Sequence, residues 1–220
     1  MKFCAISDLH GYLPNLEAVD TVLIAGDIVP LDIQSNYASS LAWFKEQFLT
    51  WAEALPCDKV IFIAGNHDGF LQAKEKEVKQ ILSEHNKCIY LKDESYFIKD
   101  KILVYGTPWC HKFGSWWFMP GDDKLEDYYS FIPFGVDILL THDVPYYIND
   151  VCMESSWGKV HAGNVWLRDA IVIKEPKMNI NGHLHSTLKE EITFRSTTCR
   201  NVSIKNEEYK FAYEPYYFEL

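Results

Sequence analysis

Short apolar runs, each ended by a small polar group, recur along the chain. Five of these runs are rich in β-branched residues or leucine and only a few residues long, as is typical of buried strands. They cover residues 3–6, 22–25, 60–64, 138–140 and 178–180. Open α/β sheets build their sites where strands end, so the polar groups after these runs predict one site at a sheet edge.

Other stretches have the spacing of helices. Apolar side chains recur at intervals of three and four between residues 35 and 55, and Pro56 then ends the pattern. Residues 70–85 are rich in Lys and Glu with a sparse apolar stripe, which predicts a surface helix. A further helix is expected over residues 164–174. Helices and strands therefore alternate along the chain.

Strand pairs are expected near the middle and at the end of the chain. Residues 95–99 and 102–106, joined by a two-residue polar turn, predict a hairpin. Residues 188–194, 197–204 and 209–218 predict an antiparallel C-terminal sheet. The tyrosines of the last segment are interpreted as sheet packing and given no role in a site.

The composition is that of one globular domain covering residues 1–220. Hydrophobic residues make up 48% of the 220 residues and charged residues 24%, with no repeats or linkers that would mark a boundary. The formal charge of −10 argues against broad binding to nucleic acids or anionic membranes. The first residues predict a strand rather than a signal segment, and no apolar run reaches membrane-spanning length, so we expect a cytoplasmic protein.

The six cysteines are scattered and form no CxxC pair, so the pattern fits neither a zinc finger nor a small disulfide scaffold. Reduced thiols are expected. Cys110 is interpreted as an incidental loop thiol rather than a nucleophile, so Cys110→Ser should leave activity largely intact.

The first polar groups hold a carboxylate and an imidazole. Asp8 and His10 are one residue apart, so on an extended chain both side chains can point to one ion. Asp27 follows Gly26 at the end of a second buried run, where an unpaired acid would be costly unless it met a cation. Each motif alone is common, and a simple turn is the competing interpretation.

The later polar groups add neutral and imidazole ligands. Asn66 offers an amide oxygen beside His67 and Asp68, and His142 follows the fourth run. The pair His183 and His185 repeats the spacing of one residue apart, so each imidazole could serve a neighbouring metal.

In this order the motifs resemble those of the calcineurin-like metallophosphoesterase superfamily, whose pattern is DxH, GD, GNH[DE], a later His and GHxH. The resemblance implies an α/β fold, a four-layer α/β/β/α sandwich with two packed mixed β-sheets and the metal site at the strand ends. It implies two ligand sets that share Asp27. The first set is Asp8, His10, Asp27 and His185, and the second is Asp27, Asn66, His142 and His183.

The resemblance also implies a chemistry. A metal-bound hydroxide would attack phosphorus in line, while His67 stabilises phosphoryl charge or protonates the leaving oxygen. Asp68 would hold the His67 ring, and Asn66 and His67 would bind substrate. Mixed Asp, His and Asn ligands suit two borderline divalent or trivalent ions, for which we expect Mn²⁺, with Fe, Zn²⁺ or Ni²⁺ as other options.

Details of the motifs favour a small phosphodiesterase-type member. Residues 26–30 read GDIVP and lack the GDxVDRG extension of the Ser/Thr protein phosphatases, which disfavours that group. Residues 105–109, 141–145 and 201–203 look more like the corresponding segments of the family's small phosphodiesterase-type members. The substrate expected is a small phosphoester resembling a cyclic nucleotide. A phosphomonoesterase, a nuclease of the same family and a non-catalytic metal-binding scaffold remain alternatives, and the residues do not indicate an oligomeric state.

An aromatic stretch over residues 109–118 could form a wall beside the metals. Trp116 and Trp117 are interpreted as loop packing on the sheet. Trp109 and His111 are the two residues of the stretch considered for substrate contact.

Overall fold

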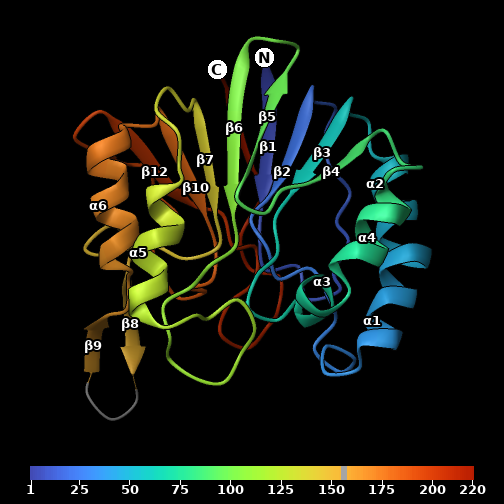
Figure 1. The fold of residues 1–220 in the computed structure, drawn as a ribbon, viewed down its shortest axis with the longest axis horizontal. Coiled ribbons are helices and arrows are strands. Elements are labelled where there is room, and N and C mark those ends of the chain that lie inside the picture. Colours follow the sequence, from blue (N-terminus) through green and yellow to red (C-terminus); the bar gives the residue numbers. More distant parts are fainter. Residues whose placement is uncertain (155–157) are drawn as a thin grey trace.

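Two β-sheets face each other in the computed structural model, which describes residues 1–154 and 158–220, and helices cover their outer faces (Figure 1). The first sheet has the order β13-β1-β2-β3-β4. Its strands are β1 (Lys2–Ile6), β2 (Thr21–Ile24), β3 (Lys59–Phe62), β4 (Cys88–Tyr90) and β13 (Tyr216–Glu219). The predicted class of two packed mixed sheets is confirmed.

The second sheet has the order β11-β12-β10-β7-β6-β5. Its strands are β5 (Glu94–Ile98), β6 (Ile102–Thr107), β7 (Ile138–Thr141), β10 (Met178–Asn181), β11 (Ile192–Phe194) and β12 (Thr197–Asn201). The predicted hairpin is confirmed, because β5 pairs with β6 in antiparallel register. A small separate sheet joins β8 (Val151–Glu154) to β9 (Gly158–His161).

Helices flank the sheets as two outer layers. One flank carries α1 (Tyr37–Trp43), the π-helical turn η1 (Phe44–Phe48), α2 (Leu49–Ala54), α3 (Gly69–Ala73) and α4 (Glu75–Leu82). The other flank carries α5 (Asp122–Ser130) and α6 (Val165–Lys174). Throughout the described residues, every helix is too short or too polar to cross a membrane.

Alternation along the strands builds a core on each side of a sheet. In β1, Phe3 and Ala5 pack between the two sheets, while Cys4 and Ile6 belong to the cluster beneath the helices. The core between the sheets also contains Ile61 of β3 and Ile138 of β7. Strands buried on both faces must be apolar at every position, which is why these segments read as continuous apolar runs.

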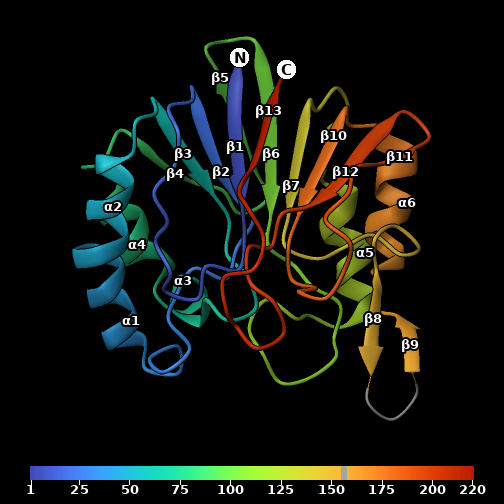
Figure 2. The same cartoon turned by 180° about the vertical axis from the view of Figure 1, so that it is seen from behind.

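The expected antiparallel C-terminal sheet is wrong in its pairing. β11 and β12 do pair antiparallel, but β12 lies parallel to β10, and β13 crosses to the first sheet to pair antiparallel with β1. Figure 2 shows β13 beside β1. Phe218 stacks on Phe3 with ring centroids 5.0 Å apart, so the last strand covers the otherwise open edge of β1.

Two helices differ in detail from the prediction. The helix expected over residues 35–55 is present and contains the π-helical turn, whereas the helix expected over residues 70–85 is interrupted at Lys74, where φ is −118°. Four elements of the described residues were not predicted from the sequence: β4, α5, and the antiparallel pair of β8 and β9. α5 buries only Leu125 and Tyr129, so its apolar stripe is too short to stand out.

Candidate metal centre

The parallel strands of both sheets end on the same side of the molecule, and the loops that follow them converge there (Figure 1). The loops after β1, β2, β3, β7 and β10 carry the seven predicted ligands. Ligand atoms lie within 4.8 Å of one another in a group of Asp8, His10 and His185 and in a group of Asp8, Asp27 and His142. The amide oxygen of Asn66 is 3.1 Å from Nε2 of His142.

Asp27 lies at the centre of this cluster. Its Oδ2 atom is 3.3 Å from Nε2 of His142, 3.8 Å from Nε2 of His10 and 3.9 Å from Nε2 of His67. Its Oδ1 atom accepts a hydrogen bond from the backbone N–H of His67 at 2.8 Å. One carboxylate therefore faces donors from both sheets, as a bridging ligand would.

Backbone carbonyls fix the tautomers of two histidines. Nδ1 of His142 donates to the carbonyl of Ala25 at 2.7 Å, and Nδ1 of His185 donates to the carbonyl of Asn206 at 2.8 Å. A carbonyl oxygen can only accept, so in each ring Nε2 is the atom left to bind a metal. This is the usual arrangement around metal-ligating histidines.

His10 provides the clearest test of whether the residues fit a metal. Its side chain is buried, and neither ring nitrogen has a hydrogen-bond partner among the described residues. An unsatisfied buried polar group is costly, and bound cations are one recurrent way to satisfy it. Because the carboxylates of Asp8 and Asp27 lie nearby, the residues fit a cation site.

Several ligands occupy a strained backbone conformation. Asp8, His10, Asp27 and His183 have positive φ angles of 57°, 40°, 55° and 67°. Non-glycine residues rarely adopt this region, and the cost is on the order of 1–3 kcal/mol for each. Such strain persists where the surrounding structure holds the chain in a conformation that function requires.

The charges of the cluster are strongly coupled. Burial disfavours the charged carboxylates of Asp8 and Asp27, but the neighbouring imidazoles outweigh it and hold both pKa values below the ordinary range. Burial also disfavours the charged form of His142, yet Asp27 raises its pKa to about 10. Burial lowers the pKa of His10 and of His183 to about 4, which keeps both rings neutral and able to bind metal.

The predicted contact between Asp68 and the His67 ring is wrong. The Asp68 carboxylate turns away and accepts backbone N–H bonds from Gly65 at 2.9 Å, Ile28 at 3.0 Å and Val29 at 3.0 Å. Asp68 therefore ties the loop after β3 to the loop after β2. Nδ1 of His67 instead meets the side-chain oxygen of Gln34, a residue that no sequence motif indicated.

A cavity of 660 Å³ opens beside these ligands. Its lining combines predicted site residues with aromatic, apolar, polar and acidic side chains. The lining residues are Asp27, Asn66, His67, His111, Phe113, Trp116, Cys152, Val160, Ala162, His183, Leu184, His185, Ser186, Glu207 and Tyr209. None of these is Lys or Arg, so within the described residues that line the cavity only histidines can carry a positive charge.

The aromatic residues of the cavity differ from the predicted ones. Trp109 is buried, with Nε1 donating to Asp93 and its ring stacked on Tyr128 at 4.0 Å. Trp116, expected to pack on the sheet, lies against His67 with ring centroids 4.5 Å apart and lines the cavity. His111, which was considered for substrate contact, does line it.

Tyr209, interpreted as sheet packing, also lies at the site. Its ring meets His10 edge-on with centroids 4.9 Å apart and His185 with centroids 5.2 Å apart. The interpretation of this tyrosine is wrong because the segment before β13 forms a loop over the strand ends rather than a strand. The tyrosines of β13, in contrast, belong to the sheet as expected.

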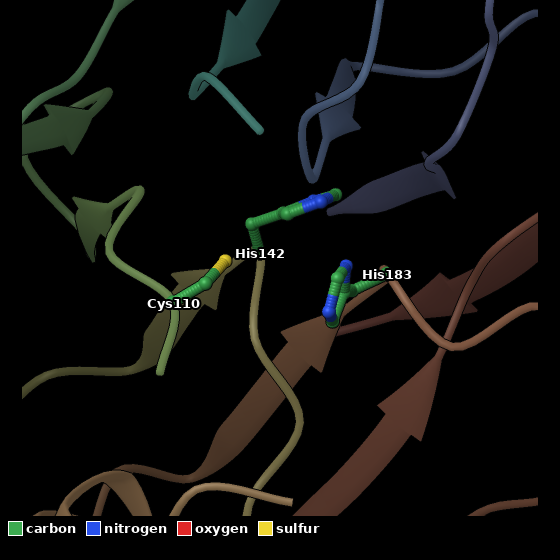
Figure 3. Close-up of side chains that lie close together, drawn as sticks. All are labelled: Cys110, His142 and His183. Atoms are coloured by element: carbon green, nitrogen blue, oxygen red, sulfur yellow. The ribbon is translucent and has the colours of Figure 1, made fainter. Parts of the chain in front are cut away.

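Cys110 lies closer to the site than expected. Its thiol and the imidazoles of His142 and His183 have ligand atoms within 4.8 Å of one another. Figure 3 shows these three side chains close together. Burial, reinforced by the carboxylate of Asp143, raises the pKa of the thiol well above its ordinary value. A neutral thiol therefore lies beside the two histidines.

Comparison with known proteins agrees with this geometry. A model of calcineurin-like phosphoesterases matches residues 1–187, which include every predicted ligand. The chain belongs to the calcineurin-like phosphoesterase family. Members of this family are typically dinuclear metal-dependent hydrolases, and the clusters around Asp27 provide candidate ligands.

Known relatives align with the whole chain at low identity. Human metallophosphoesterase domain-containing protein 1 is 25% identical over 243 residues, covering 100% of this chain and 71% of the relative. A UPF0046 protein of Caenorhabditis elegans is 26% identical over 241 residues, and the alignment covers 100% of this chain and 81% of the relative.

Solved structures share the fold. Phosphopantetheinyl hydrolase from Mycobacterium tuberculosis superimposes with a TM-score of 0.61 at 13% identity, covering 94% of this chain and 90% of the other. The protein TT1561 of Thermus thermophilus superimposes with a TM-score of 0.60 at 16% identity, covering 91% and 88%. At these identities the similarity establishes the calcineurin-like fold alone.

Proposed function

We propose that this protein is a dinuclear metal-dependent phosphodiesterase acting on a small substrate. The proposal rests on the five loops that bring the candidate ligands together around Asp27. One of these ligands, His10, has a buried imidazole without a hydrogen-bond partner among the described residues. One ion would be held by Asp8, His10, Asp27 and His185. The other would be held by Asp27, Asn66, His142 and His183, and we expect manganese in both positions.

Two bound ions supply an activated water and neutralise charge that develops on the phosphoryl oxygens. The chain itself supplies a proton donor. Gln34 accepts from Nδ1 of His67, which directs Nε2 of the same ring toward the centre where Asp27 lies. Protonated His67 would give its Nε2 proton to the leaving oxygen, and Asn66 would help to hold the substrate.

The lining of the cavity supports a diester over a monoester. A phosphodiester carries one negative charge, whereas a phosphomonoester carries up to two. A cavity without Lys or Arg among its described lining residues, and with Glu207 at its wall, favours the less charged ester. Trp116, Phe113 and Tyr209 supply flat faces for an organic group such as a nucleobase. These features support a substrate resembling a cyclic nucleotide.

The test is hydrolysis of bis-p-nitrophenyl phosphate and p-nitrophenyl phosphate by purified protein that has been chelated and reloaded with Mn²⁺. We expect faster turnover of the diester, with kcat reduced by about 10²–10⁴-fold in His67→Ala, because general acid catalysis contributes on that order. Preference for the monoester would replace the proposal with a phosphomonoesterase. Turnover of neither ester by protein holding two ions would favour a scaffold.

A further inference from the structure

His111 lines the same cavity as His67 but has a different partner. Nδ1 of His111 is 3.0 Å from Oδ2 of Asp143, and the backbone N–H of His111 donates to the same oxygen at 2.8 Å. His67 meets only a neutral amide at its Nδ1, from Gln34. A carboxylate stabilises a protonated imidazole far more than an amide does, so the contact with Asp143 favours the positively charged form of His111.

Both carboxylate oxygens of Asp143 accept hydrogen bonds. Its side chain has an exposed fraction of 0%, with Oδ1 accepting from the backbone N–H of Val144 at 2.9 Å and Oδ2 accepting from Nδ2 of Asn164 at 2.8 Å. A buried carboxylate is stable only when charge or hydrogen bonds compensate it. Asp143 therefore fixes both the position of His111 and its tautomer, in which Nδ1–H faces the carboxylate and Nε2 is free for another contact.

The direction of the pKa shift of His111 agrees with this contact. Burial lowers the pKa of His111, but Asp143 outweighs it, with a smaller contribution from Asp122, and the net shift is upward. Together with the distance of 3.0 Å between Nδ1 of His111 and Oδ2 of Asp143, this direction describes an ion pair at the wall of the cavity.

An aromatic ring connects His111 to the metal ligands. Phe113 has its ring centroid 6.0 Å from that of His111 and 5.1 Å from that of His183. The His111 side chain retains an exposed fraction of 27%, so a molecule in the cavity can reach it. The carboxylate-paired imidazole of His111 and the predicted ligand His183 therefore line the same cavity, with Phe113 in contact with both.

We propose that His111, held by Asp143, binds an anionic oxygen of the substrate beside the metal ions. The substrate class rests on the phosphoesterase function proposed above, but the contact itself requires only an anion such as phosphate. In this role Asp143 is a positioning residue, and His111 supplies the donor that Lys or Arg supplies in other phosphate sites. The competing interpretation is that the pair only anchors the loop after β6.

The chain provides a matched control. Nδ1 of His161 is 2.7 Å from Oδ1 of Asp150, so this pair has the same chemistry as His111 and Asp143. The His161 ring packs on Tyr147 with centroids 4.2 Å apart and is outside the lining of the cavity. His161→Gln therefore removes an imidazole and carboxylate pair without removing a cavity donor.

The experiment measures binding of inorganic phosphate to manganese-loaded protein by calorimetry, for wild type, His111→Gln, Asp143→Asn and His161→Gln. We expect at least about tenfold weaker binding for His111→Gln, because a charge-assisted hydrogen bond is lost. Asp143→Asn should weaken binding severalfold, and His161→Gln should match wild type. KM for bis-p-nitrophenyl phosphate should rise with His111→Gln by more than kcat falls.

Manganese content and thermal unfolding of each variant separate binding from folding. Unchanged phosphate affinity in folded, fully loaded His111→Gln would overturn the inference, and so would an equal loss in His161→Gln. The phosphodiesterase proposal fails separately, if wild type binds phosphate but does not hydrolyse the diester. If His111→Gln does not bind manganese, Asp143→Asn becomes the test variant. Wild-type phosphate affinity in manganese-loaded Asp143→Asn would then overturn the inference.

Discussion

A proton and a metal ion would compete for the same atom of His142, Nε2, because Nδ1 donates to the carbonyl of Ala25. In the protein without ions, burial opposes its charged form but the carboxylate of Asp27, 3.3 Å away, raises its pKa to about 10. Metal binding through Nε2 requires that proton to leave. The same electrostatic attraction that holds Asp27 and His142 together therefore makes metal binding depend on pH.

This coupling predicts how the stability of chelated protein changes with pH. Folded His142 keeps its proton up to about pH 10, whereas the unfolded residue loses it near its ordinary value of 6.5. The folded state then binds more protons between these values, so the free energy of unfolding falls as pH rises through this window. His185, whose pKa is also raised by Asp8 against the effect of burial, acts in the same direction.

We expect the Tm of chelated wild type to fall more between about pH 7 and pH 9.5, which lie inside this window, than the Tm of chelated His142→Gln, measured by circular dichroism. Comparison with the variant removes contributions from other titrating groups. Equal decreases in Tm in the two proteins would show that folded His142 does not keep its proton in this pH window.

At the residue scale, the sequence identifies the candidate ligands better than it identifies the residues around them. Asp8, Asp27 and His142 follow strand-like runs directly, so a short motif fixes their place at the strand ends. Gln34 and Trp116 reach His67 from loops whose path depends on packing between distant segments. No local spacing signals such contacts, which is why they were not predicted.

Cys110→Ser tests whether the thiol beside the site takes part in catalysis. Since the thiol is buried and neutral, we expect kcat for the diester to change less than about threefold and manganese content to stay the same. Loss of bound manganese, measured by atomic absorption, would instead make the thiol a ligand.

At the element scale, the loops after β2 and β3 are packed so closely that only glycine fits between them. A Cβ atom on Gly65 would lie 2.2 Å from Oδ1 of Asp27 and 2.5 Å from the backbone nitrogen of Asp27. Something must move to accept a methyl group, and the nearest group is the proposed bridging carboxylate. The geometry of the site is therefore set by backbone packing as well as by the ligands.

Gly65→Ala should reduce manganese affinity by at least about tenfold, because displacement of Asp27 weakens both ligand sets. The control is Gly135→Ala, where φ is 77° and no atom of the described residues lies within 4 Å of the added methyl group. That variant carries backbone strain and should lose stability while keeping manganese. Equal manganese affinity in Gly65→Ala and wild type, measured by calorimetry, would contradict the packing argument.

Strand identity was easier to predict than strand partners. The apolar pattern of residues 209–218 indicates a strand, and part of it forms β13, but periodicity does not say which edge the strand covers. The partner is decided by the open edge of β1 and by the stacking of Phe218 on Phe3. These two residues lie at opposite ends of the sequence, so no local pattern connects them.

At the scale of the whole molecule, the chain ends are tied to each other and to the inter-sheet core. The amino group of Met1 donates to the carbonyl of Leu220 at 2.8 Å, and β1 and β13 lie side by side (Figure 2). Site residues come from both sheets, so the metal centre requires the two sheets to stay packed.

We predict that the manganese-loaded protein unfolds as one domain. Tryptophan fluorescence and far-UV circular dichroism should give coincident transitions in denaturant, because both sheets share one core. Two separated transitions would indicate that the sheets form independent units.

The proposed phosphodiesterase activity requires two ions held around Asp27. The most direct test adds Mn²⁺ stepwise to chelated protein and follows bound manganese and hydrolysis of bis-p-nitrophenyl phosphate together, with Asp27→Asn as the control. We expect full activity only as binding approaches two ions per chain, and we expect neither tight manganese binding nor turnover in Asp27→Asn. Full activity with a single bound ion, or undiminished activity in Asp27→Asn, would contradict this requirement.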